Sequence, residues 1–266
     1  MNKPERRIRI HGHRGARAIY PENTLPAFEY AIGCGADVLE LDLAVTADNV
    51  LVVSHDPAMN PAFCQGPADS PRVIRAMTLA ELREWDCGAR ANPAFPRQQA
   101  VPGTRVPTFA EVLALAPRGS FEFNVETKIF AARPQLTPSP EEFARLVYEA
   151  VAPLGLQHRL ILQSFDFRTL EAMRRIDASI RLSALFDAGS TSLVERSLAT
   201  GARIISPHFS LAKRSLVEQA HASGLEVVPW TANTPEQWRT LIDAGVDGII
   251  TDDPAALIAY LNAEPD

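Results

Sequence analysis

The segment Val38–Val45 reads VLELDLAV, and its residues follow a two-residue period. Three leucines alternate with Glu40 and Asp42, so a strand would carry the leucines on one face and both acids on the other. A barrel strand packs one face against helices and turns the other toward the barrel centre. We therefore expect the leucines to cover the outside of a barrel and the two acids to point inward.

A second segment repeats this arrangement. In FNVETKI, residues 123–129, Asn124, Glu126 and Lys128 alternate with apolar or β-branched residues. Three carboxylates crowded into a poorly solvated site would take up protons unless a cation compensated them. Carboxylate oxygens suit a hard divalent ion, Mg²⁺ or Ca²⁺. The competing interpretation is an internal salt-bridge network in which the acids pair only with Arg14 and Lys128.

Strand-like runs alternate with helical patterns along the whole chain, as in a parallel sheet built from βα units. The expected strands are Ile8–His13, Val38–Val45, Ser120–Lys128, Leu160–Phe165, Leu182–Phe186, Arg203–Pro207, Glu226–Thr231 and Gly248–Thr251. The expected helices include Thr24–Gly33, Glu141–Ala152, Arg168–Ile176, Thr191–Ala199, Lys213–Ser223, Pro235–Ala244 and Pro254–Leu261. Eight such units in 266 residues predict one (β/α)8 TIM-barrel domain over residues 1–266.

Residues 56–107 interrupt this alternation. The segment holds many prolines, one short expected helix at Leu79–Trp85 and little strand character. We interpret it as an insertion after the second strand. Loops that follow barrel strands lie on the active-site face, so the insertion should overhang the mouth and shape substrate access. A surface excursion without substrate contact is the alternative.

Charge and composition exclude several classes of protein. Lys and Arg number 26 against 32 Asp and Glu, and the net charge of -6 argues against a nucleic-acid partner. No window approaches the roughly 18 apolar residues of a transmembrane segment, and no signal-peptide pattern is seen, so we expect a cytoplasmic protein. Cys34, Cys64 and Cys87 are an odd number without C-x-x-C spacing, and we expect unpaired thiols.

Two histidines could supply proton transfer beside the acids. His13 ends the first expected strand, and His55, followed by Asp56, comes just after an apolar run near the same face. One imidazole can deprotonate an attacking hydroxyl and the other can protonate a leaving oxygen. Arg14 and Lys128 can neutralise phosphate oxygens, so the combination indicates phosphoryl chemistry.

Seven segments, taken in order, resemble the glycerophosphodiester phosphodiesterase family. They are GHRGARAIYPENTLPAF (12–28), ELDLAVTADNVLVVSHDP (40–57), VPTFAEVLAL (106–115), NVETK (124–128), LQSFD (162–166), VPWTANTPEQW (228–238) and AGVDGIITDDP (244–254). The resemblance implies the same barrel with an insertion after its second strand. It also implies acid and base roles for His13 and His55, metal ligation by Glu40, Asp42 and Glu126, and phosphate contacts from Arg14 and Lys128.

The resemblance further implies a reaction. Family enzymes hydrolyse small glycerophosphodiesters to glycerol 3-phosphate and an alcohol, in lipid and glycerol metabolism, with one divalent metal, here Mg²⁺ or Ca²⁺. We hypothesise that the substrate's own glycerol hydroxyl attacks phosphorus, that water opens the cyclic phosphate, and that the two histidines alternate roles. The segment HDPAMNPAFCQG lacks the Asp-Arg-Thr-Thr run often seen after His-Asp-Pro, which leaves the head-group preference open.

Further residues are candidates by position. Gln163, Phe165 and Trp230 come at or near strand ends on the expected active-site face and could line the substrate pocket, with core packing as the competing interpretation for the two aromatic residues. His11 should point inward one layer below His13 and act as a hydrogen-bonding partner, for example to a metal-ligating carboxylate. Helix capping is the expected role of residues 22–24 and of 251–254.

Three other functions stay open at this point. One is lysophospholipase D activity, which needs an apolar groove for an acyl chain. Another is a metal-dependent barrel lyase or isomerase, which would turn over sugars or acids without releasing phosphate. The third is a binding barrel without turnover, which two histidines beside inward acids make the least favoured. The oligomeric state is not indicated by the sequence.

Overall fold

Parallel strand pairing sets the architecture of the chain. The computed structural model describes residues 8–263, and its sheet runs in the order β8-β7-β6-β5-β4-β2-β1-β9, with β3 paired to β2 beside that path. The strands are β1 Arg9–Gly12, β2 Val38–Val45, β3 Leu51–Val53, β4 Glu122–Thr127, β5 Leu160–Ser164, β6 Arg181–Phe186, β7 Ile204–Pro207, β8 Glu226–Val227 and β9 Gly248–Thr251. The helices are α1 Leu25–Cys34, α2 Leu79–Leu82, α3 Phe109–Leu113, α4 Pro140–Val151, α5 Phe167–Ile176, α6 Leu193–Thr200, α7 Arg214–Ala222, α8 Pro235–Ala244 and α9 Pro254–Ala263.

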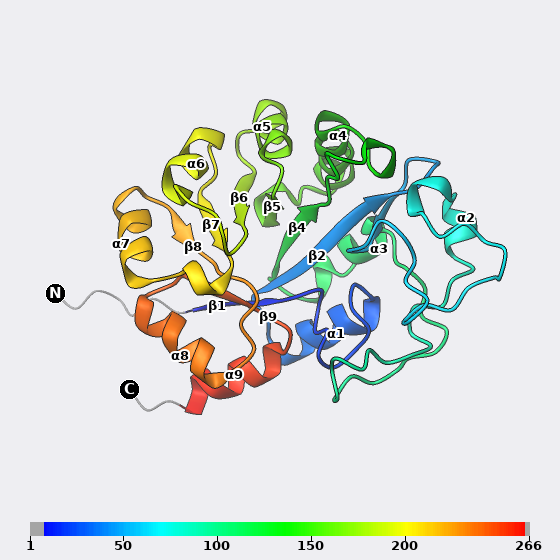
Figure 1. Ribbon diagram of the computed structural model, residues 1–266, viewed down its shortest axis with the longest axis horizontal. Coiled ribbons are helices and arrows are strands. Elements are labelled where there is room, and N and C mark those ends of the chain that lie inside the picture. The colour runs from blue at the N-terminus through cyan, green and yellow to red at the C-terminus, as the bar shows by residue number, and fades with distance from the viewer. Residues whose placement is uncertain (1–7, 264–266) are drawn as a thin grey trace.

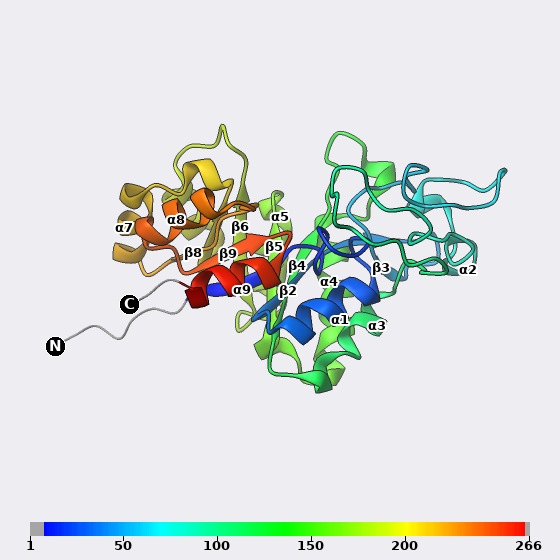
Figure 2. The same ribbon diagram turned by 90° about the horizontal axis from the view of Figure 1, so that it is seen from below.

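The two ends of this sheet meet and nearly close a barrel. Ile250 of β9 donates its N–H to the carbonyl of Pro229 at 3.0 Å, and Ala232 donates to the carbonyl of Ile250 at 3.0 Å. The helices that follow the strands surround the sheet, as Figures 1 and 2 show. The expectation of a (β/α)8 barrel is confirmed.

Strand register brings the acidic residues together. In the parallel pairing of β2 with β4, Glu40 lies opposite Asn124 and Asp42 lies opposite Glu126. Glu126 in turn lies opposite Gln163 of β5. Because paired residues in a sheet point to the same side, these polar side chains share the inner face. The leucines of β2 are fully buried and belong to the main apolar core with the helices.

Amphipathic sequence places the helices on the outside. In α4, Phe143, Val147 and Val151 recur at helical spacing and are buried in the core. The helix begins after Ser139, whose hydroxyl accepts a hydrogen bond from the N–H of Glu142. Within residues 8–263, no helix is both long enough and apolar enough to cross a membrane.

Two strands differ from the expectation by more than a shift of one or two residues at their ends. β3 was not expected, and it pairs antiparallel with the end of β2 through a turn in which Asn49 adopts a φ of 61°. β8 covers only Glu226–Val227 instead of Glu226–Thr231. Pro229 has no N–H to donate to the ladder, so the regular strand stops before it.

Residues 56–107 form a lobe beside the barrel, at the end of the molecule away from α7 in both views (Figures 1 and 2). The lobe has an apolar cluster of its own, which also includes Val52 of β3. The buried members of this cluster are Val52, Met59, Ile74, Met77, Leu82, Trp85 and Val106. The expected helix at Leu79–Trp85 is shorter, Leu79–Leu82, and its N-terminus is closed by reciprocal hydrogen bonds between Thr78 and Glu81.

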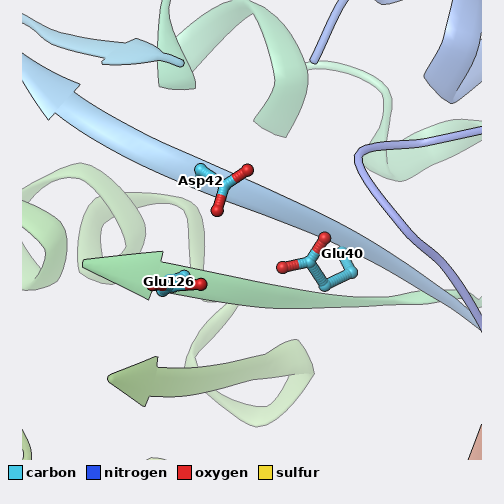
Figure 3. A group of neighbouring side chains, drawn as sticks. All are labelled: Glu40, Asp42 and Glu126. Carbon is cyan, nitrogen blue, oxygen red and sulfur yellow. The ribbon is translucent and has the colours of Figure 1, made fainter. Parts of the chain in front are cut away.

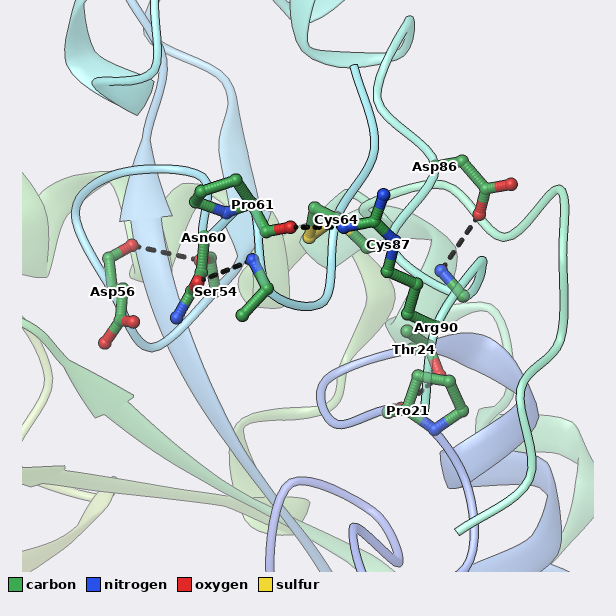
Figure 4. The surroundings of a disulfide bond; sticks show 12 residues. Pro21, Thr24, Ser54, Asp56, Asn60, Pro61, Cys64, Asp86, Cys87 and Arg90 are labelled. Carbon is green, nitrogen blue, oxygen red and sulfur yellow. Dashed lines mark hydrogen bonds between the residues drawn. A yellow bond between two sulfur atoms is a disulfide. The ribbon is translucent and has the colours of Figure 1, made fainter. Parts of the chain in front are cut away.

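The expectation of unpaired cysteines is wrong for two of the three. Cys64 and Cys87 form a disulfide (Figure 4), whereas Cys34 is free. Gln65 and Asp86 exchange backbone hydrogen bonds of 2.7 Å in both directions, which brings the neighbouring cysteines side by side. Counting cysteines could not find this pair, because the contact joins two loops of the lobe. Disulfides persist mainly in oxidising compartments, so this one does not support the expected cytoplasmic location.

Candidate active site

Three carboxylates meet at the inner face of the barrel. Glu40 and Asp42 extend from β2 and Glu126 from β4, and one oxygen atom from each lies within 4.8 Å of the others (Figure 3). The three residues are 2%, 1% and 6% exposed, respectively. Oxygen donors at such spacing can hold a hard divalent cation.

The charges near these carboxylates are unequally compensated. Burial, together with the charge of Asp42, raises the pKa of Glu40 well above its ordinary value. Burial also raises the pKa of Glu126, against the opposing charge of Lys128. Burial acts in the same direction on Asp42, but the charges of Lys128 and Arg14 outweigh it and hold the pKa of Asp42 well below its ordinary value. Without a further cation, the ionised forms of Glu40 and Glu126 are therefore disfavoured.

Arg14 and Lys128 contact the same acids. The Lys128 Nζ lies 3.0 Å from Asp42 Oδ1 and 2.7 Å from Glu126 Oε1. Arg14 places its Nε 3.2 Å from Asp42 Oδ2, and its Nη1 donates to Glu22 Oε1 at 2.6 Å. The ion pairs of the salt-bridge interpretation are therefore present, yet they leave Glu40 and Glu126 with raised pKa values.

The loop after β1 is shaped to hold these groups. Arg14 has a φ of 50° and Gly15 a φ of 86°, and a Cβ on Gly15 would lie 2.7 Å from the carbonyl carbon of Ala27. This turn lets the Arg14 N–H donate to Glu40 Oε2 at 2.9 Å. Glycine at position 15 is therefore required by both the backbone angle and the close contact.

Two of the residues 22–24, which directly precede helix α1, also contact residues of the site. Asn23 donates from Nδ2 to Asp42 Oδ2 at 2.9 Å, and Glu22 pairs with Arg14. Thr24 occupies the N-cap position of α1 without a side-chain capping bond, and its hydroxyl donates to the carbonyl of Pro21. The expectation of capping alone is wrong for Asn23 and Glu22, because Asn23 contacts the acidic cluster directly and Glu22 pairs with an arginine that contacts it.

His13 is oriented by a carboxylate that the sequence analysis assigned to helix capping. Its Nδ1 lies 2.5 Å from Asp252 Oδ1, and its Nε2 lies 4.0 Å from Glu40 Oε2. Burial raises the pKa of Asp252, but the charges and hydrogen bonds of His13, Arg17 and Asn233 together outweigh it, and the net shift is downward. An ionised carboxylate can only accept a hydrogen bond, so Nδ1 carries the hydrogen and Nε2 is left as a base. Burial lowers the pKa of His13 and Asp252 offsets this only in part, which favours the neutral imidazole.

His55 lies across the same hollow on the chain that follows β3. Its side chain is 36% exposed, and its Nδ1 lies 2.8 Å from Asp56 Oδ1. The hydrogen bond to His55 lowers the pKa of Asp56, so this carboxylate is also the acceptor and leaves the His55 Nε2 free. Each histidine is therefore paired with an aspartate through Nδ1.

A cavity of about 310 Å³ joins these groups. Its lining includes both histidines and the acids Glu40 and Glu126, together with Arg14, Lys128, Gln163, Phe165 and Trp230. Phe165 is 39% exposed, and its ring packs edge-to-face on Trp230 with centroids 5.5 Å apart. Gln163 donates from Nε2 to Glu40 Oε1 at 2.7 Å. All the candidate residues except Asp42 and His11 line this space.

His11 lies below the cavity and is 2% exposed. Its Nδ1 is 3.5 Å from Asn124 Nδ2, Asn124 donates to Gln163 Oε1 at 3.0 Å, and Gln163 donates to Glu40. His11 thus reaches the carboxylate through two amide side chains and not directly. Burial, followed by the charges of Arg9 and Arg181, lowers the pKa of His11 well below its ordinary value, so this ring is neutral.

Two residues of the site were not found by sequence analysis. Asp252 was read as a cap, whereas it is Asp253 that accepts a hydrogen bond from the N–H of Ala256 at 2.9 Å. The sequence could have indicated Asp252, because this residue directly follows a barrel strand at the face where active sites lie. Arg17 also lines the cavity, and nothing in its local sequence distinguishes it from a surface arginine.

Comparisons with known proteins give a consistent result. Residues 13–256 match the sequence model described as the Glycerophosphoryl diester phosphodiesterase family. A glycerophosphodiester phosphodiesterase of Caldanaerobacter subterraneus subsp. tengcongensis is 32% identical over 246 residues, covering 92% of this chain and 94% of that protein.

Solved structures agree with this match. A protein from Silicibacter pomeroyi DSS-3, whose name places it among the glycerophosphoryl diester phosphodiesterases, gives a TM-score of 0.88 at 30% identity over 97% of this chain and 94% of that chain. An Oleispira antarctica phosphodiesterase in complex with its product sn-glycerol-3-phosphate gives a TM-score of 0.81 over 96% and 97% of the two chains. At 22% identity, the second likeness shows the fold alone.

Proposed function

The chain belongs to the glycerophosphoryl diester phosphodiesterase family and is an enzyme of that class, and from this premise we propose that it hydrolyses glycerophosphodiesters to glycerol 3-phosphate and an alcohol. The observation that carries the proposal is the placement of two aspartate-paired histidines around one cavity, beside a cluster of three buried carboxylates. The Caldanaerobacter relative, a glycerophosphodiester phosphodiesterase by name, supports the proposed substrate class.

The acidic cluster fits a divalent metal. Its ligand oxygens lie within 4.8 Å of one another, and burial leaves Glu40 and Glu126 with raised pKa values that a cation would reverse. The hard oxygen donors favour Mg²⁺ or Ca²⁺ over softer ions. We propose Glu40, Asp42 and Glu126 as the ligands. A metal bound there would polarise a phosphoryl oxygen and neutralise the charge that develops on it.

In the first step, we propose that His13 acts as the general base. Its buried, neutral imidazole presents Nε2 to the cavity because Nδ1 is held by Asp252. It would take the proton of the substrate's glycerol hydroxyl as that oxygen attacks phosphorus. His55 would give a proton to the leaving alcohol oxygen, and Arg14 and Lys128 would bind the phosphate oxygens. The product of this step is a cyclic phosphate and the free alcohol.

In the second step, the two histidines exchange roles. His55 would take a proton from the attacking water, and His13, protonated in the first step, would return its proton to the glycerol oxygen as the ring opens. Each histidine then regains its starting protonation state. The sequence of two proton transfers explains why the site has two imidazoles with separate aspartate partners.

The central test is a substrate panel assayed with the metal-stripped protein and again with Mg²⁺, Ca²⁺ or Mn²⁺ restored. We expect glycerol 3-phosphate release from glycerophosphodiesters only when metal is present. His13→Ala and His55→Ala should each lower kcat by at least about 10²-fold, the usual contribution of a general acid or base. Wild-type rates in both variants would contradict the mechanism.

Matched substrates separate the alternatives. A phosphodiester that lacks the attacking glycerol hydroxyl should be cleaved much more slowly, and equal rates without a detectable cyclic phosphate would exclude the two-step route. Faster cleavage of lysophospholipids than of water-soluble glycerophosphodiesters would favour lysophospholipase D activity instead. We further propose that residues 56–107 select the alcohol, since His55 lines both the main cavity and a hollow of about 70 Å³ in the lobe.

A further inference from the structure

A third cationic side chain, Arg17, lies in the main cavity and has no role in the proposed chemistry. It lines the same space as His13, Arg14 and Lys128, and its side chain is 19% exposed. It extends from the loop after β1, three residues beyond Arg14. An arginine held largely out of water at a phosphate-binding site needs a partner for its charge.

The partners of Arg17 overlap only in part with those of the other two cations. Arg14 and Lys128 both contact Asp42, whereas the contacts of Arg17 are with Glu22 and Asp252. The Arg17 Nε lies 3.1 Å from Glu22 Oε2 and 3.8 Å from Asp252 Oδ1. Both carboxylates already serve other groups, because Glu22 also pairs with Arg14 and Asp252 faces the His13 ring.

The guanidinium of Arg17 keeps hydrogen-bonding capacity. Its Nε is buried and lacks a hydrogen bond of acceptable geometry. Across residues 8–263, neither of its two terminal amino groups has a hydrogen-bond acceptor in the protein. A guanidinium offers these two groups as a fixed planar fork, which matches two oxygens of one phosphoryl group.

The inserted lobe holds Arg17 in place. The Arg17 Cζ lies 4.6 Å from the centre of the Phe95 ring, and Gln98 donates from Nε2 to the backbone carbonyl of Arg17 at 2.6 Å. Gln99 donates its N–H to the carbonyl of Ile19 at 2.8 Å, which fixes the next turn of the same loop. The stacked ring orients the guanidinium plane, so the lobe reaches the cavity through this side chain.

We propose that Arg17, stacked on Phe95, is a further phosphate-binding residue that contacts the phosphoryl group of the substrate and the product. This inference rests on the proposed function. Because a phosphomonoester product carries about twice the charge of the diester at neutral pH, Arg17 should contribute most to binding of the product and of inorganic phosphate. Phe95 is the positioning residue, since it acts only through Arg17.

The test compares Arg17→Gln, Arg17→Lys and Phe95→Ala in the full chain with Mg²⁺ present. Arg17→Gln should lower kcat/KM for a glycerophosphodiester by about tenfold or more and raise the inhibition constant of inorganic phosphate by a similar factor. Arg17→Lys, which keeps the positive charge, should lower kcat/KM and raise the inhibition constant of inorganic phosphate by smaller factors than Arg17→Gln does. Phe95→Ala should also lower kcat/KM and raise the phosphate inhibition constant, by smaller factors. When it is combined with Arg17→Gln, it should have no further effect on either quantity.

Arg196→Gln is the matched control. Arg196 stacks on Phe167 and Phe186 at 5.0 and 4.9 Å and lies on α6, away from the cavity lining. The Arg196→Gln variant should therefore have the same phosphate inhibition constant as the wild type. An unchanged inhibition constant in Arg17→Gln, with or without a lower thermal midpoint, would overturn the proposal, because a purely structural role predicts that result.

Failure of the proposed function would be distinguishable. If the wild-type protein released no glycerol 3-phosphate, calorimetric titration of the full chain with inorganic phosphate would replace the kinetic readout. Weaker phosphate binding in Arg17→Gln than in Arg196→Gln would still support the assignment of Arg17. Equal binding in the two variants would overturn it.

Discussion

At the scale of single residues, the main result is the pairing of each histidine with its own aspartate. His13 meets Asp252 and His55 meets Asp56, both through Nδ1. These pairings fix the tautomer that leaves Nε2 available in the cavity. The environments differ, since the His13 side chain is 12% exposed and that of His55 is 36% exposed. The buried pair should therefore be the more sensitive to substitution.

Asp252→Asn tests the role of this carboxylate. We expect kcat to fall by roughly 10-fold to 10²-fold, less than on removal of the imidazole itself, because the ring is retained but loses its fixed tautomer. Asp252 partly offsets the lowering of the His13 pKa by burial. In Asp252→Asn this offset is lost, so the pKa of His13 should be lower than in the wild type. A base is active when neutral, and the acidic limb of the kcat/KM profile should therefore move to lower pH. An unmoved limb together with wild-type kcat would argue against orientation by Asp252.

His11 and His13 should separate in function although they lie two residues apart. His11→Gln replaces a neutral, buried ring that contacts Asn124 with an amide that can take over its hydrogen bonding, so much of the activity should remain. His13→Ala should lose about 10²-fold in kcat. Steady-state kinetics on both variants, with thermal midpoints to check folding, decides the question. Comparable losses would refute the distinction.

At the scale of elements, the lobe at 56–107 is held by contacts at several points. The disulfide Cys64–Cys87 joins two of its loops, and Asp86 accepts from the N–H groups of Gly88 and Gly103 at 2.9 and 2.6 Å. Both cysteines line the small hollow that His55 also borders. The disulfide therefore contributes to the order of the lobe and to the shape of this hollow.

Removal of this bond should loosen the lobe without unfolding the barrel. The two cysteines are separated by 23 positions, and a crosslink over a loop of that size contributes about 3 kcal/mol in the chain-entropy account. The Cys64→Ser, Cys87→Ser double variant should show faster amide hydrogen exchange in 56–107 and a higher KM, with slow exchange retained in the barrel strands. Cys34→Ser is the matched control. Unchanged exchange in the lobe would show that its other contacts suffice.

At the scale of the whole molecule, the barrel gathers charge at its centre that the protein does not fully neutralise. Glu40, Asp42 and Glu126 are buried on adjacent strands, and two of them have raised pKa values. Without a metal, burial therefore disfavours the ionised forms of Glu40 and Glu126. A bound cation should stabilise the fold as well as the reaction.

Metal addition should raise the thermal midpoint. At 100 times its dissociation constant, a ligand specific for the folded state adds about 2.7 kcal/mol, which corresponds to roughly 5 to 10 °C for a chain of this size. Because Glu40 and Glu126 hold protons more tightly when folded, protons compete with the metal, and the shift should grow as pH rises from 5 to 7. Scanning calorimetry with and without a chelator measures it, and Glu40→Gln should abolish most of the shift. An equal shift in that variant would place the metal elsewhere.

Local patterns in the sequence determined the barrel and the core of its site. The two-residue alternation in β2 and β4 predicted which acids point inward, and the eight alternating units predicted the fold, because strand faces and helix spacing depend on neighbours a few residues away. His13, His55, Arg14 and Lys128 were found the same way. Their common cavity follows from the rule that strand ends gather at one face of a barrel.

The tertiary structure alone decided the contacts that join distant segments. Asp252 and His13 are 239 positions apart, Phe95 meets Arg17 from the lobe, and Cys64 meets Cys87 because Gln65 pairs with Asp86. Neither hydrophobic periodicity nor residue spacing encodes which aspartate reaches which histidine. These partners are set by the register of β9 beside β1 and by the path of the lobe, and both are properties of the folded chain.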